Sequence, residues 1–141
     1  MMKWNCINLS SLEEKIMTIR HAYLPTILIS TLMTIACSTE HKPGYTADVR
    51  PILDKYCAEC HMPDKVGAKK SGFQIDSYAS IMKGTKLGPV IVPGSAESST
   101  LYRLVAHKAD PKINMPHGKA PLTPGEIETI RLWIDQGAMD N

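Results

Sequence analysis

The sequence predicts an all-α domain of about three to five short helices joined by long loops. Two apolar stripes with helical spacing indicate this fold class, one from Val49 to Tyr56 and one from Ile127 to Ile134. A shorter stripe lies between them, from Leu101 to Val105. No segment rich in β-branched residues leads into Tyr56, so a strand at that position is not expected.

The first predicted helix has its apolar residues at i, i+3, i+4 and i+7: Val49, Ile52, Leu53 and Tyr56. Asp48 is the expected N-cap. Pro51 then falls in the first turn, where its missing N–H does no harm. This helix would carry the next residues of the chain, Cys57 to His61, on its continuing face.

The last predicted helix has a clear beginning and end. Thr123 caps it, Pro124 takes the first helical position and Glu126 completes a capping box. Gly137 ends it. Its buried stripe consists of Ile127, Ile130, Trp133 and Ile134, and we expect this stripe to meet that of the first helix. Core packing and contact with a cofactor both remain open for Trp133.

Two shorter helices are expected in between. SYASIMKG, residues 77–84, reads as one of them. Ser98 or Ser99 begins the other, with its apolar residues facing inward: Leu101, Leu104 and Val105. KLGPVIVPGS, residues 86–95, is expected to be a loop or a short extended piece.

The N-terminal region resembles an export signal. AYLPTILISTLMTIA, residues 22–36, is uncharged and follows Arg20 and His21. It is shorter than the ~20 apolar residues of a transmembrane helix. We expect residues 1–36 to be a signal peptide, with Met17 as an alternative start. An amphipathic N-terminal helix of the mature chain is the other interpretation.

The signal ends in TIAC, which resembles the lipobox of bacterial lipoproteins. Cys37 would then be lipidated, although Thr34 stands where Leu is usual. The alternative is a signal cut near the same place without lipid. Residues 37–44 would form a polar tether and residues 45–141 the domain. The expected location is the periplasm or a periplasm-facing membrane surface.

Charge and composition exclude some functions. The chain has 141 residues, is 43% hydrophobic and carries a net charge of +2, with scattered basic residues. The predicted mature chain would have 13 basic and 12 acidic residues. Nucleic-acid binding is therefore not expected. Aromatic residues make up only 6%, so a core built from side chains alone would be thin.

The central motif is Cys57-Ala58-Glu59-Cys60-His61, which has the C-x-x-C-H spacing of covalent haem attachment. On one helix, both thiols and the imidazole share a face, so the thiols can bond to a haem whose iron His61 ligates. Cys6 would leave with the signal and Cys37 would carry lipid. A disulfide between the remaining two cysteines would close too small a loop to stabilise the fold much.

A structural zinc site and a thioredoxin-like dithiol are the two alternatives to a haem. A structural zinc site needs four ligands, and His107 and His117 would have to complete it, although they are ten residues apart. A thioredoxin-like dithiol needs a strand-to-helix context, which is missing here. Both are less consistent with the sequence than a haem.

A second axial ligand is expected far along the chain. Met115 lies in the Pro-rich loop DPKINMPHGKAPLTP, where a side chain can be directed at a ligand. Met62 neighbours His61 and cannot reach the opposite haem face, Met82 is expected in the core, and Met139 lies near the C-terminus. His107 and His117 are the other candidate ligands. Pro89 or a nearby carbonyl could accept the second ring N–H of His61.

In order along the chain, YTADVRPILDKYCAECH, GFQIDSY, VIVPGSAESSTLYRLV, MPHG and LTPGEIETIRLWIDQGA resemble the planctomycete-type cytochrome c domain, over about residues 45–138. The resemblance implies a cytochrome c-like fold wrapped around one covalent haem c. It also implies that Cys57 and Cys60 bind the haem, with His61 as proximal and Met115 as distal ligand. The family more often has MPP where this chain has Met115-Pro116-His117.

The expected function is single-electron transfer by a monohaem c-type cytochrome, with redox proteins of the envelope as partners, rather than enzymatic catalysis. The alternatives are a haem enzyme or gas sensor with an open or displaceable distal position, and a structural lipoprotein without haem. The oligomeric state is left open. Lys69, Lys70, Lys83 and Lys86 form either a basic docking face or an ordinary solvated surface.

Overall fold

The computed structural model describes residues 41–141. The predicted signal peptide, Cys37 and the start of the tether lie outside these residues. In the described part of the chain the structure is helical, and its only β-type pairing is a single bridge between Thr85 and Gly88. The all-α prediction is therefore confirmed. None of the helices within residues 41–141 is both long and apolar enough to cross a bilayer.

The helical structure begins at Tyr45, earlier than predicted. A π-helical segment, η3 (Tyr45–Val49), continues directly into α1 (Arg50–His61). Asp48 therefore lies inside the first turn and is not the N-cap of α1. Its carboxylate instead accepts a hydrogen bond of 2.8 Å from the Gly44 N–H, one of the free donors at this helix end. The predicted stripe is confirmed, because Val49, Ile52 and Leu53 are buried.

The C-terminal helix α5 (Pro124–Asp135) follows the sequence prediction closely. The Thr123 side chain accepts from the Glu126 N–H, and the Glu126 carboxylate accepts from the Thr123 N–H at 2.8 Å, which completes the capping box. The N–H of Gly137, whose φ is +107°, donates to the Ile134 carbonyl at 2.9 Å and closes the end of the helix.

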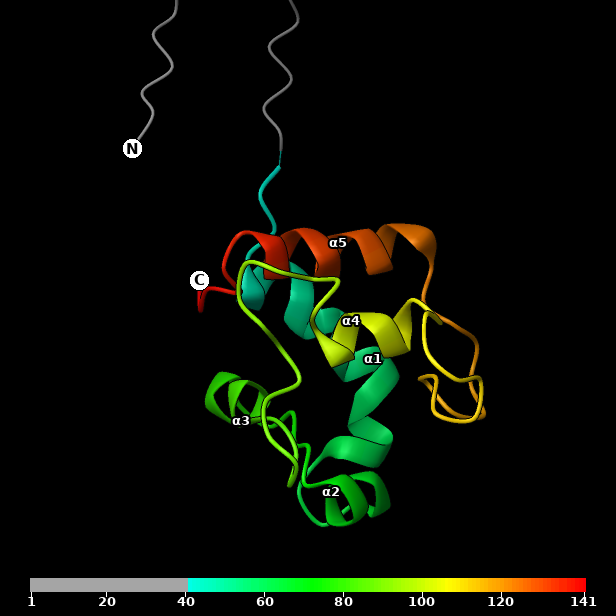
Figure 1. Cartoon of the computed structure of the whole chain (residues 1–141). Helices are drawn as coiled ribbons and strands as arrows, with labels where there is room; N and C mark the ends of the chain where they lie inside the picture. Colours follow the sequence, from blue (N-terminus) through cyan, green and yellow to red (C-terminus); the bar gives the residue numbers. More distant parts are fainter. Residues whose placement is uncertain (1–40) are drawn as a thin grey trace, which may run out of the picture. The chain divides into compact units, whose positions relative to one another are not determined.

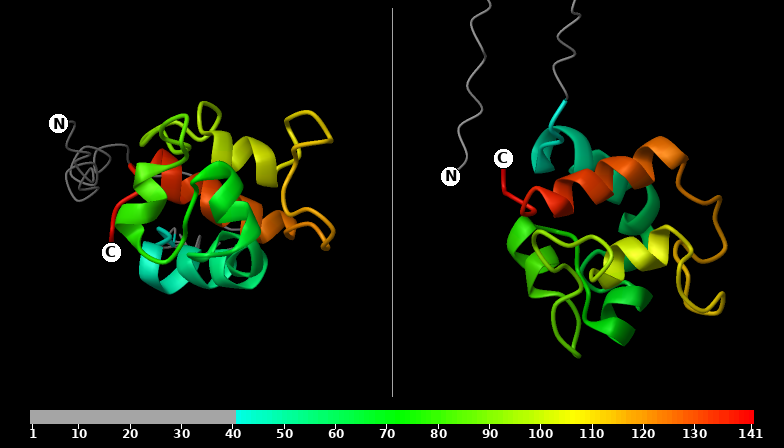
Figure 2. Two further views of the ribbon diagram at one scale, coloured as in Figure 1. Left: turned by 90° about the horizontal axis from the view of Figure 1, so that it is seen from below. Right: turned by 45° about the horizontal axis from the view of Figure 1, so that its top comes forward.

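Three short helices connect these two: α2 (Val66–Ser71), α3 (Tyr78–Lys83) and α4 (Thr100–Val105). The predictions of α3 and α4 are confirmed, with Ser77 and Ser99 as their N-caps. No helix was predicted at α2, which is too short to show an apolar period. In Figure 1, α5 lies at one end of the domain and α2 at the other, with α1 running between them. Figure 2 shows the same arrangement from two further directions.

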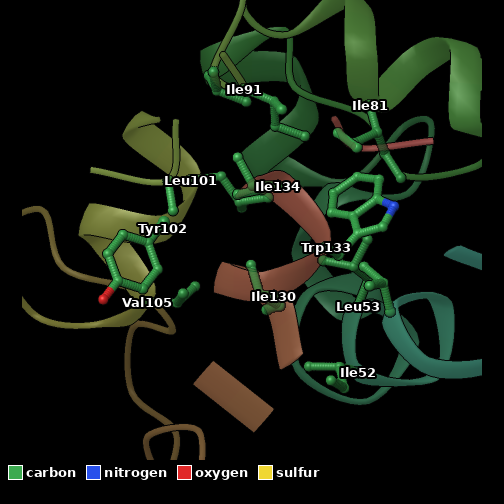
Figure 3. Packing of buried hydrophobic residues seen from close by; sticks show 14 of the residues in the cluster. Ile52, Leu53, Ile81, Ile91, Leu101, Tyr102, Val105, Ile130, Trp133 and Ile134 are labelled. Atoms are coloured by element: carbon green, nitrogen blue, oxygen red, sulfur yellow. The ribbon is translucent and has the colours of Figure 1, made fainter. Parts of the chain in front are cut away.

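The two predicted stripes meet in one core cluster (Figure 3). Ile52 and Leu53 from α1 pack in the same cluster as Ile130 and Trp133 from α5. Trp133 is 1% exposed, and its indole N–H donates to the Met139 carbonyl at 2.9 Å. Of the two roles left open for Trp133, core packing is the one that the structure shows.

Candidate functional site

The C-x-x-C-H motif occupies the C-terminal half of α1. Cys57, Cys60 and His61 stand at i, i+3 and i+4 of this helix, so they share one face, as the sequence predicts. All three side chains line a cavity of about 490 Å³. This volume lies within the ~300–1,000 Å³ typical of ligand and cofactor sites.

The imidazole of His61 has a fixed orientation. Its Nδ1 lies 3.1 Å from the Phe73 carbonyl oxygen, which can only accept a hydrogen bond, so Nδ1 carries the proton. The other ring nitrogen, Nε2, therefore keeps its lone pair available to a metal ion. The Phe73 ring packs edge-on against the imidazole, with ring centroids 5.3 Å apart. The acceptor predicted at or near Pro89 is wrong in position, because Phe73 supplies it.

A short chain of hydrogen bonds supports this carbonyl. The hydroxyl of Ser71 accepts from the Phe73 N–H at 3.0 Å and donates to the Gly67 carbonyl at 2.7 Å. The backbone that holds His61 is thus tied to α2. The sequence does not predict Ser71 and Phe73 as site residues. The nearest sequence signal is Gly72, a residue type that often ends a helix, and in the structure it ends α2 with a φ of +81°.

α2 forms one wall of the cavity and lies very close to α1. A Cβ on Gly67 would stand 2.7 Å from the Cys60 carbonyl oxygen and 3.1 Å from the imidazole of His61. Only glycine permits this approach, so α2 can cover the end of the motif.

The two cysteines are free thiols. Burial raises the pKa of Cys57 to about 11, so this thiol stays protonated at neutral pH. A redox-active dithiol needs the opposite, a thiolate with a lowered pKa. Among residues 41–141, no three His, Cys, Asp or Glu side chains gather closely enough to hold a metal ion. These findings weigh against the dithiol and zinc alternatives.

Another part of the wall comes from α4 and the loop that follows it. Leu101, Leu104 and Val105 line the cavity together with Met115. The Met115 N–H donates to the Leu104 carbonyl at 3.1 Å, which fixes the loop to α4. Although Met115 is far from His61 in the sequence, both side chains line the same cavity.

The other candidate ligands are placed differently. Met115 is the only methionine of the described residues that lines the cavity. Met62, Met82 and Met115 all pack against the core, but Met62 and Met82 do not line the cavity, and Met139 is 62% exposed. Of the two histidines, His117 lines the cavity and His107 does not.

Two polar contacts join the segments around the cavity. Tyr56, part of the cavity wall, donates to the Glu126 carboxylate of α5 at 2.8 Å. Lys119, on the loop that carries Met115, forms an ion pair with Glu59 of α1. Neither partnership was predicted, because no sequence period links residues so far apart.

These residues fit the predicted haem. The wall contains the two thiols of Cys57 and Cys60, the imidazole of His61 with its Nε2 free, and the thioether sulfur of Met115. These are the groups that bind a c-type haem. The remaining wall is largely aliphatic and aromatic, as a flat apolar macrocycle requires.

Comparison with known proteins gives an independent result. Residues 57–133 match the family model described as Planctomycete cytochrome C. No curated protein and no solved structure matches the chain. The matched segment covers more than half of the chain and includes the whole motif, α2, α4 and Met115. The chain therefore belongs to the planctomycete cytochrome C family.

Proposed function

We propose that this c-type cytochrome holds one haem c through Cys57 and Cys60, ligates its iron with His61 and Met115, and transfers single electrons in the bacterial cell envelope. The observation that carries the proposal is the cavity, whose wall brings these four side chains together. When bound, the haem iron supplies the change between two oxidation states that single-electron transfer needs.

The role of each residue follows from its chemistry. Cys57 and Cys60 would hold the haem, each thiol adding across one vinyl group: one S–C bond would form, the vinyl C=C bond would become single, and the thiol proton would end on the neighbouring carbon. The Phe73 carbonyl orients His61 and increases the basicity of its Nε2. The thioether of Met115, paired with histidine, would raise the reduction potential.

If His61 and Met115 both ligate the iron, they would leave no position open for a substrate or gas. This favours an electron carrier over the enzyme and sensor alternatives. An export signal over residues 1–36 and a lipid on Cys37, both predicted from the sequence, would place the domain on the periplasmic side, where redox partner proteins would exchange electrons with it. The predicted tether, residues 37–44, would hold the domain off the membrane.

Purified protein, denatured in detergent and separated by electrophoresis, tests the attachment. We expect a covalent haem stain that disappears in the Cys57→Ala/Cys60→Ala variant, and a redox titration that fits one single-electron step. An unstained wild-type band would contradict the attachment, and a failure to titrate would contradict electron transfer.

A further inference from the structure

A rigid turn beside the cavity presents an isolated apolar side chain. Leu87, at the tip of the turn Thr85–Gly88, is 99% exposed. The Thr85 N–H donates to the Gly88 carbonyl at 2.8 Å, and the Gly88 N–H donates back at 3.1 Å. The Thr85 hydroxyl also accepts from the Leu87 N–H at 3.1 Å. Leu87 is therefore held outward by the turn itself, without packing inside the chain.

This turn is fixed to α2, so the two form one surface. The N–H of Lys86 donates to the Ser71 carbonyl at 2.9 Å, and its Nζ donates to the Lys69 carbonyl at 2.7 Å. Gly72 allows the contact, because a Cβ there would stand 2.8 Å from the Lys86 side chain. We call this surface the docking face; it consists of Val66, Lys69, Lys70, Lys86 and Leu87.

The docking face borders the cavity. Val66, Lys70 and Thr85 all line it, and Val66 is 58% exposed. Because Val66 and Lys70 are both exposed and line the cavity, the cavity wall reaches the protein surface at α2. Figures 1 and 2 show the course of α2 and of the chain around the turn. A partner that covers this face would come close to whatever the cavity holds.

The charge of the described residues is concentrated here. Residues 62–86 contain five lysines and two aspartates, whereas residues 87–141 contain five basic and six acidic residues. Most carboxylates elsewhere in the described part of the chain form ion pairs with cations outside the docking face. Lys69, Lys70 and Lys86, the lysines of the docking face, form no ion pair with any of the described residues.

We propose that the docking face binds a redox partner protein whose surface is acidic around an apolar contact. In protein interfaces, charged groups at the rim attract an oppositely charged partner during encounter, and apolar side chains at the centre are buried once the complex has formed. Lysines around an exposed leucine provide both. A membrane-binding surface would present a continuous apolar face, whereas Leu87 and Val66 stand singly among lysines. The inference rests on the proposed electron transfer.

The first test measures local charge at the point of electron exchange. Second-order rates of the holoprotein are measured at low ionic strength with hexacyanoferrate, an anion, and hexaammineruthenium, a cation. We expect Lys69→Glu/Lys86→Glu to slow the anionic reagent about tenfold and to accelerate the cationic one. The control Lys42→Glu/Lys112→Glu changes net charge equally outside the docking face and should have little effect on either rate. Equal effects of the two double variants would overturn the proposal.

The second test concerns the apolar contact. Polyglutamate and a random glutamate–tyrosine copolymer serve as acidic probes. Lys69→Glu/Lys86→Glu should abolish binding of both, and Leu87→Ser should weaken only the copolymer. If both variants bind the two probes as tightly as the wild type does, the proposal is overturned. So would binding to phosphatidylglycerol-containing vesicles that depends on Lys69 and Lys86, since the face would then recognise a membrane. If neither small reagent exchanges electrons with the wild type, the proposed function itself fails.

Discussion

The hydroxyl of Tyr56 donates a hydrogen bond of 2.8 Å to the carboxylate of Glu126 and so joins the helix of the C-x-x-C-H motif to the capping box of the last helix. Lys55 reaches the other carboxylate oxygen at 2.9 Å. Glu126 thus caps the N-terminus of α5 and also joins α5 to α1. Tyr56, its partner on α1, lines the cavity.

Removing the Tyr56 hydroxyl should therefore destabilise the fold. We expect Tyr56→Phe to lower the free energy of unfolding by about 1–2 kcal/mol, because the bond ends on a charged, partly buried group. Tyr45→Phe is the matched control. The Tyr45 hydroxyl is buried near the Arg50 guanidinium but forms no well-aligned hydrogen bond among the described residues, so its removal should cost less than removal of the Tyr56 hydroxyl. Guanidinium unfolding of both holoproteins checks this; equal losses would contradict the assignment.

The same carboxylate predicts a pH dependence. Hydrogen bonds from Thr123, above all from its backbone N–H, lower the pKa of Glu126 from 4.5 to about 2, and Lys55 and Tyr56 add to this. Because the pKa is lower in the folded state, the stabilisation is complete above pH 4.5 and is lost as the pH falls toward 2. Unfolding measured across this window should show a shallower acid loss in Glu126→Gln than in the wild type. Asp140→Asn, an exposed carboxylate, is the control; identical slopes in all three proteins would refute the role of Glu126.

The close contact between α1 and α2 predicts that Gly67 cannot carry a side chain. Gly67→Ala places a Cβ against the Cys60 carbonyl and the His61 ring, so α2 must move and the cavity wall opens. We expect a loss of stability of about 1–3 kcal/mol, the usual cost of overpacking, and a changed ferric spectrum. Gly125→Ala, where the added Cβ meets no atom within 4 Å, should be neutral or slightly stabilising. The prediction fails if the two variants behave alike.

Loss of the haem should leave a poorly folded chain. Without the haem, the largely apolar wall of this cavity of about 490 Å³ would be left uncovered, and a small domain has only about 5–15 kcal/mol of stability with which to offset the lost burial. Thermal melting followed by circular dichroism should show a cooperative transition for the holoprotein. It should show none, or a much lower one, for protein produced without haem attachment. An apo chain as stable and cooperative as the holoprotein would disprove this.

The parts of the fold that the sequence predicts are those with local signals. Thr123, Pro124 and Glu126 define the start of α5 through contacts within one turn, and the stripe of α1 places Cys57 and His61 on one face. The spacing of Cys57, Cys60 and His61 is likewise local, so the sequence alone predicts that these three side chains share one face of a helix. Asp48 misled the prediction because the chain is already helical at Tyr45.

The remaining features depend on contacts between distant segments. Phe73 orients His61 through a backbone carbonyl, which any residue type could supply. α2 is too short for a period, and its packing depends on the absence of a side chain at Gly67. The pairing of Tyr56 with Glu126 joins residues 70 positions apart. Such relationships become visible only when the chain is folded.

The most direct test of the proposed site is the optical spectrum of the ferric holoprotein, compared with Met115→Ala and the core control Met82→Leu. We expect the wild type and the control to be low-spin, with the weak sulfur-to-iron charge-transfer band. Met115→Ala should lose the band and have a lower reduction potential. A wild-type protein that is high-spin, or that keeps the band after Met115→Ala, would contradict ligation by His61 and Met115.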